Sequence, residues 1–179
     1  MKLVILFLFS VIVCTQVVSQ NSKPNDRWFI QPQIFAGYTI GEYKSGYGCG
    51  GGIRCLYDFE KKFLGGPLFL GLETSFLSSL GFAPSEYGIV YNKQNHLILA
   101  AVLEQNYQWF KCGFHFSTGI GYYIGIQGLN KNSIGMITNI GWFPIYKGRA
   151  ITPYLTYRND WVFDKNKTNM QSISIGLNF

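Results

Sequence analysis

The last ten residues of the chain, 170–179, alternate between apolar and small or polar side chains. Ile173, Ile175, Leu177 and Phe179 occupy every second position, and serine, glycine and asparagine occupy most of the positions between them. Because successive side chains of a β-strand point to opposite faces, this pattern predicts a strand with one apolar and one polar face. Such a strand must cover its apolar face with a protein core or with lipid.

The same alternation recurs along the chain, in stretches that are long enough to cross a bilayer as tilted strands. These stretches are 28–40, 47–59, 67–78, 96–108, 110–125, 133–144 and 150–163. With the terminal strand they make an even number of eight, which fills the chain beyond its N-terminal segment. The sequence therefore predicts an all-β domain over 28–179, an eight-stranded antiparallel up-and-down transmembrane β-barrel.

Composition favours a barrel in lipid over a barrel in water. Charged residues make up 13% of the chain, whereas soluble domains devote about a quarter of their residues to charge. One face of the expected strands carries almost no charge, and a soluble barrel would carry charge on its outward face. A secreted, lipocalin-like ligand-binding barrel is the alternative, and it predicts a protein that stays in solution without detergent.

The N-terminal segment has the features of an export signal. Lys2 is followed by an uncharged apolar run over 3–13 and by small and polar residues up to Ser19. This pattern predicts a signal peptide over 1–19 that is cleaved after export. The polar residues 20–27 are then expected to form a short periplasmic tail.

The connections between the expected strands alternate in length. The short ones are 60–66, 109–111 and 145–149, and the others, which include the longer polar ones, are 41–46, 80–95, 128–132 and 164–167. In membrane barrels the short turns are periplasmic and the long loops extracellular. The sequence thus predicts that 80–95 is the largest extracellular loop.

Aromatic residues gather near both ends of the expected strands, as in the girdles of membrane barrels. Those near the periplasmic ends are Trp28, Tyr57, Phe59, Tyr107, Trp109, Trp142 and Phe143, and those near the outer ends are Tyr38, Tyr122, Trp161 and Phe163.

Eight amphipathic strands behind an export signal, ending on an aromatic residue, resemble the small bacterial outer-membrane β-barrel family of OmpA/OmpX-like and PorT-like proteins. The resemblance covers 28–179 and implies a location in a bacterial outer membrane, among its lipid and lipopolysaccharide. It also implies that Ile173, Ile175, Leu177 and Phe179 form the insertion signal for the barrel-assembly machinery. The family is defined by architecture, so the resemblance implies a structural or surface-interaction role and assigns no catalytic residue.

The inward rows of the expected strands contain several ionisable side chains. These are Arg54, Asp58, Glu73, His115, Arg158 and Asp160. Side chains nearly fill an eight-stranded barrel, so we expect the charges to pair with one another, with Glu73 bound to Arg158 or Arg54. The sequence predicts a plugged lumen; a small gated pore built on the same residues is the alternative.

A lipid-modifying enzyme is a further alternative. The tripeptide His115-Phe116-Ser117 superficially resembles the His-x-Ser motif of the lipid A deacylase family, which supplies a glutamate further along the chain. A serine hydrolase needs its histidine oriented by such a third group. Here no glutamate follows Glu104, and Thr-Gly-Ile follows Ser117 where that family has Asn-Ala. We therefore expect no enzymatic activity and no cofactor.

Cysteines and basic residues add no further site. Cys49 and Cys55 lie on one expected strand and Cys112 on another, without histidine at ligand spacing, so no metal site is expected. The net charge of +6 is not organised into basic and aromatic clusters, which argues against nucleic acid. Several lysines instead fall in the expected outer loops, where they solvate the loops or meet a surface partner: Lys44, Lys93, Lys131, Lys165 and Lys167.

Overall fold

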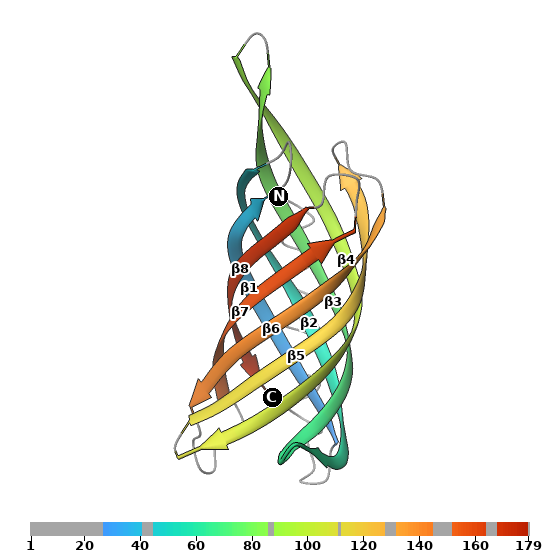
Figure 1. Ribbon diagram of the computed structural model, residues 1–179, viewed down its shortest axis with the longest axis vertical. Helices are drawn as coiled ribbons and strands as arrows, with labels where there is room; N and C mark the ends of the chain where they lie inside the picture. Colours follow the sequence, from blue (N-terminus) through green and yellow to red (C-terminus); the bar gives the residue numbers. More distant parts are fainter. Residues whose placement is uncertain are drawn as a thin grey trace.

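The chain forms a closed barrel of antiparallel strands joined in chain order (Figure 1). The computed structural model describes residues 27–40, 45–85, 88–110, 112–127, 132–144, 152–163 and 168–178. The predicted signal peptide, most of the predicted tail and Phe179 lie outside these ranges. The strands are β1 (Trp28–Ile40), β2 (Ser45–Phe63), β3 (Gly66–Ser85), β4 (Gly88–Trp109), β5 (Cys112–Gln127), β6 (Ser133–Pro144), β7 (Thr152–Val162) and β8 (Asn169–Asn178).

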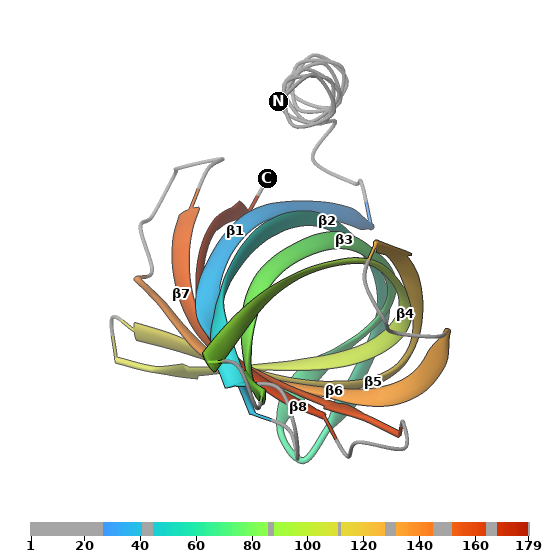
Figure 2. The same cartoon turned by 90° about the horizontal axis from the view of Figure 1, so that it is seen from above.

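Pairing between the first and last strands closes the barrel. Residues Gln33 to Ile40 of β1 lie in antiparallel register with Gly176 to Asn169 of β8, and the view from above shows the strands as a ring (Figure 2). The predicted eight-stranded antiparallel up-and-down barrel is therefore confirmed. Among the described residues, no helix has the length and apolar character needed to cross a membrane.

The two ends of the barrel differ. At one end β2 and β3, and likewise β4 and β5, are joined by tight turns; we call this the short-turn end. At the other end β3 and β4 continue as a two-stranded hairpin beyond their neighbours (Figure 1). We call this the hairpin end.

The prediction of a loop over 80–95 is wrong, because most of that segment is strand. β3 and β4 are 20 and 22 residues long, and they pair without interruption from Leu68 with Gln105 to Ser85 with Gly88. The polar residues of 85–95 suggested a loop. A hairpin that leaves the bilayer, however, tolerates polar side chains on both faces, and the Ile89-Val90-Tyr91 run has high β-propensity.

The outward face is apolar, as the alternation predicts. Ile34, Leu72 and Ile120 are each more than 60% exposed, and the outward row of β8 includes Ile173, Ile175 and Leu177. Exposed apolar side chains in this number would be costly in water, at roughly 25 cal/mol per Å². A lipid environment removes that cost.

Aromatic rings mark the strand ends. At the short-turn end Trp28 contacts Tyr57, with ring centroids 5.0 Å apart, and at the hairpin end Tyr38 contacts Tyr47 at 5.2 Å. Phe143 does not belong to the aromatic girdle near the periplasmic ends, where the sequence predicted it. It follows Trp142 on the strand, so it points inward, where its ring stacks on His115 at 6.3 Å.

Glycines on the inner face let neighbouring backbones approach. A Cβ at Gly119 of β5 would lie 2.3 Å from the backbone oxygen of Ala101, whereas a Cβ at Gly121 would first meet side-chain atoms of Ile137 and Tyr123 at 3.2 Å. The backbone oxygen belongs to the neighbouring strand and has no room to move.

These two glycines provide a matched pair of substitutions. We expect Gly119→Ala to lower the free energy of unfolding by about 1–3 kcal/mol, the usual range for overpacking, and Gly121→Ala to have the smaller effect. Urea unfolding of the barrel in detergent, followed by tryptophan fluorescence, measures both. Equal effects would show that backbone contact at Gly119 is not what restricts the position.

Candidate functional site: an ionic cluster in the lumen

Five charged side chains meet inside the barrel. Arg54 of β2, Glu73 of β3, Glu104 of β4, and Arg158 and Asp160 of β7 are each 3% exposed or less. We call them the lumen cluster. Alternation turns all five inward, and the register sets Arg54 directly opposite Glu73 on the neighbouring strand.

Arg54 binds carboxylates of two strands. Its Nη2 and Nε donate to Glu73 Oε2 at 2.8 and 3.2 Å, and its Nη1 donates to Glu104 Oε2 at 2.9 Å. The planar guanidinium thus uses three of its N–H groups on β3 and β4.

Arg158 approaches Glu73 from β7. Its Nε and Nη2 donate to the two oxygens of Asp160 at 2.7 and 2.9 Å, and its Nη1 donates to Glu73 Oε1. The guanidinium carbon also lies 5.3 Å from the centre of the Phe35 ring, within the range of a cation–π contact. Glu73 therefore bridges two arginines that come from different parts of the wall.

Hydroxyl groups complete the cluster. Three carboxylates and two guanidinium groups leave one net negative charge, which is costly in a buried site unless hydrogen bonds compensate it. The hydroxyl of Tyr123 donates to Asp160 Oδ1 at 2.8 Å, and the hydroxyl of Ser75 donates to Glu73 Oε1 at 3.2 Å.

The structure brings together four of the six predicted lumen residues and adds one. Arg54, Glu73, Arg158 and Asp160 are in the cluster, with Glu73 bound to both candidate arginines. Glu104 was not predicted. It lies in the inward row of its strand, but the middle of that strand, 97–103, is apolar on both faces, so the row did not stand out as a polar one.

Asp58 does not belong to the cluster. It lies four residues beyond Arg54 on the same strand, about 13 Å further along at the usual rise per residue. It is half-buried at the short-turn end, where its Oδ1 accepts a hydrogen bond from the Glu60 backbone at 2.7 Å. Alternation gave the correct face for Asp58, but depth in the barrel separates it from the other charges.

His115 is inside the barrel and also outside the cluster. Its Nε2 lies 2.8 Å from Thr156 Oγ1, and its ring sits between Phe143 and Tyr154. Ser117, two residues on, accepts a hydrogen bond from Asn139 Nδ2 at 2.9 Å. Both members of the His-x-Ser pair thus face the lumen, each with a partner of its own.

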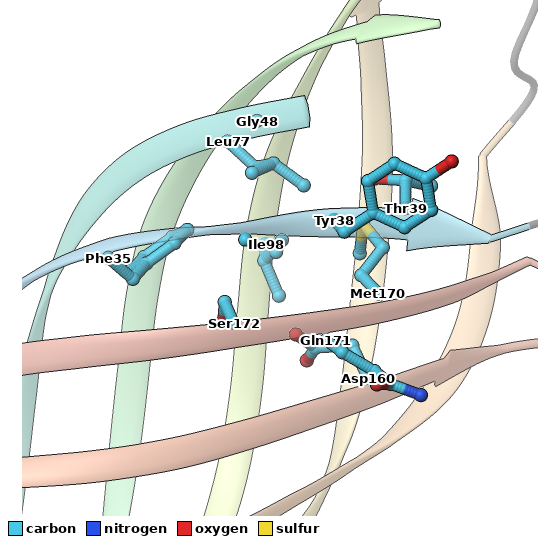
Figure 3. Close-up of a pocket in the computed structure, with 11 residues that line it drawn as sticks. Phe35, Tyr38, Thr39, Gly48, Leu77, Ile98, Asp160, Met170, Gln171 and Ser172 are labelled. Atoms are coloured by element: carbon cyan, nitrogen blue, oxygen red, sulfur yellow. The ribbon is translucent and has the colours of Figure 1, made fainter. Parts of the chain in front are cut away.

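On the hairpin side of the cluster the lumen is almost filled. A cavity of about 10 Å³ is close to the volume that one water molecule needs. Figure 3 shows the side chains around it, with Asp160 beside Gln171 and Ser172. The apolar side chains that restrict it are Phe35, Leu77, Ile98 and Met170.

No metal-binding arrangement accompanies these carboxylates. Within the described ranges, no three His, Cys, Asp or Glu side chains are placed to hold a metal ion together. Cys49, Cys55 and Cys112 form no disulfide with one another.

Comparisons with known proteins identify the fold. No family model and no curated protein matches the sequence. Among solved structures, Neisserial surface protein A aligns with a TM-score of 0.63 and 10% identity over 86% of this chain and 96% of its own. The chain has the fold of small outer-membrane β-barrels.

Two further outer-membrane barrels support this assignment. OprG from Pseudomonas aeruginosa aligns with a TM-score of 0.57 and 10% identity over 85% of this chain and 95% of its own. The outer membrane enzyme PagL aligns with a TM-score of 0.52 and 15% identity over 83% of this chain and 98% of its own. The resemblance to OmpA/OmpX-like barrels thus holds at the level of the fold.

Glu73 is the residue on which the cluster depends most, because both arginines bind it. We expect Glu73→Gln to lower the free energy of unfolding by about 3–5 kcal/mol, the usual cost of removing one partner from a buried ionic group. Asp58→Asn is the matched control, since it removes an inward carboxylate outside the cluster, and we expect a loss below about 1 kcal/mol. Urea unfolding in detergent compares them, and similar losses would contradict the special role of Glu73.

Proposed function

We propose that this chain is an integral barrel protein of a bacterial outer membrane with a structural or surface-interaction role and a lumen closed to solutes. The observation that carries the proposal is the lumen cluster. Its side chains from β2, β3, β4 and β7 cross the interior and bind one another, so the charges hold the lumen shut. Wide aqueous channels, by contrast, belong to barrels of about 16 strands.

The difference between the two ends of the barrel supports one orientation of the barrel in the outer membrane. Short turns of membrane barrels are periplasmic and long connections are extracellular. The short-turn end then faces the periplasm, and the β3–β4 hairpin projects from the cell surface. A paired hairpin of this length presents a surface that the barrel itself does not need, which makes it the best candidate for contact with a partner.

The proposed role involves no enzymatic chemistry. A serine nucleophile needs a histidine within hydrogen-bond reach as its base. His115 is bound to Thr156 and Ser117 to Asn139 instead. Both lie inside the barrel, away from the lipid that a lipid-modifying enzyme would act on.

A gated pore is the second candidate, and one observation favours it. Several buried polar atoms of the inner face have no hydrogen-bond partner among the described residues, among them Gln33 Nε2, Tyr154 Oη and Ser174 Oγ. Buried polar groups of this kind are usually hydrated. Water bound to these atoms would form a continuous path through the lumen only if the lumen cluster rearranged.

Conductance separates a plug from a pore. We expect the wild-type protein in a planar bilayer to show no stepwise current. The double variant Arg158→Ser/Asp160→Ser removes a bound pair without changing the net charge, and we expect it to conduct because it opens one side of the cluster. Leu72→Ala, on the lipid face, is the control and should remain silent. Steady current through the wild-type barrel would favour the pore.

Location and orientation have their own test. We expect the protein to fractionate with the outer membrane and to migrate differently on a gel when it is not boiled, because a closed barrel resists detergent. In a variant with its native cysteines replaced by serine, a membrane-impermeant maleimide applied to intact cells should label Ser85→Cys at the hairpin and spare Leu64→Cys in a short turn. The reverse labelling would invert the proposed orientation, and a soluble protein without a gel shift would favour the secreted barrel.

A further inference from the structure

A groove on the outward face of the barrel lies between apolar side chains and the ammonium-bearing side chain of Lys93. It lies over β2, β3 and the adjoining part of β4, has a volume of about 350 Å³, and is lined by Tyr47, Gly48, Cys49, Ser78, Ser79, Leu80 and Lys93. We call it the outer groove. Its volume is at the lower end of the range of small-molecule sites, roughly 300–1,000 Å³.

Strand register explains why a groove forms here. Tyr47, Leu80 and Lys93 are aligned across β2, β3 and β4, and all three point outward. One outward position closer to the middle of the barrel, the aligned residues of β2 and β3 are Cys49 and Ser78. A row of small side chains next to a row of large ones leaves a depression in the surface.

The groove combines two chemistries. Tyr47 is 71% exposed and Leu80 42% exposed, so the groove has an apolar rim. Lys93 is exposed beside them and forms no ion pair within the described part of the chain. Tyr47 also contacts Tyr38, an aromatic residue of the hairpin end, where such rings lie at the level of lipid headgroups.

We infer that the outer groove binds a phosphate-bearing lipid of the outer leaflet, with its phosphate on Lys93 and an acyl chain over Cys49 and Ser78. A lysine on a lipid-facing surface is costly unless its ammonium group reaches the headgroup region, where its charge complements a phosphate. The small side chains provide the space that one acyl chain occupies below that phosphate. This inference rests on the proposed outer-membrane location.

Native mass spectrometry of the full chain in detergent, titrated with lipid A, tests the inference. We expect Lys93→Gln and Cys49→Phe each to weaken the apparent affinity at least tenfold, the first by removing the cation and the second by filling the groove. Lys62→Gln, an exposed lysine at the short-turn end, and Cys55→Phe, an outward position of the same strand outside the groove, are the matched controls. Both should stay within twofold of the wild type.

Several outcomes would overturn the inference. Unchanged affinity of Lys93→Gln, or an equal loss in Lys62→Gln, would show that this lysine is not a specific site. Displacement of lipid A by millimolar inorganic phosphate alone, or full affinity of Cys49→Phe for lipid A, would show that no acyl chain occupies the outer groove. A protein dimer that Cys49→Phe abolishes would assign the groove to a second copy of this chain.

The rate at which cysteines of the wild-type protein react with a maleimide tests the same inference, and it does not depend on whether a variant folds. Bound lipid A should slow the reaction of Cys49 with a maleimide relative to that of Cys55, and equal slowing or none would overturn the inference. The gel shift and the membrane fractionation keep the two proposals apart. A soluble protein refutes the outer-membrane location, whereas a membrane barrel without lipid binding at this groove refutes only the inference.

Discussion

The whole structure depends on one constraint, which is that a strand in lipid has no water to satisfy its backbone N–H and C=O groups. Pairing of β1 with β8 meets this constraint by giving every strand two neighbours. Closure with only eight strands also fixes the width of the interior, so inward side chains must fill it. The apolar outer face and the packed inner face are both consequences of this closed hydrogen-bond network.

The narrow interior explains why the charges form a single cluster. A lone buried carboxylate or guanidinium group would be far more costly than one that binds several partners. Glu73 resolves this by accepting from Arg54 and Arg158 at once. The cluster also favours one register, because a slip of β3 by a single residue would turn Glu73 outward into lipid. Its contribution to specificity is therefore more secure than its contribution to net stability, since buried ion pairs often do no better than apolar packing.

The sequence predicted correctly whether most side chains point into or out of the barrel, but it did not predict how far along the barrel axis they lie. Period-two alternation was enough to locate every strand and to turn Arg54, Glu73, Arg158 and Asp160 inward. Which inward residues meet depends on register and strand tilt, and a single sequence does not contain this information. For that reason Asp58 points inward as predicted but lies too far along the barrel axis to reach the cluster. Glu104 was overlooked because Ile98 and Val102 make its inward row look apolar.

The length of β3 and β4 was missed for a different reason. Within lipid the strand pattern is sharp, because one face must be apolar and the other is free to be polar. Beyond the bilayer water solvates both faces, so the alternation that identifies a strand disappears although the backbone pairing continues from Gly81 with Asn92 to Ser85 with Gly88. Barrels that share 10–15% of their residues with this chain show the same fold, so closure and alternation demand very little of any one side chain. Residues that depart from that minimal pattern, such as Lys93 and Cys49 on the outer face, are not explained by the fold, and that is the reason to look for function there.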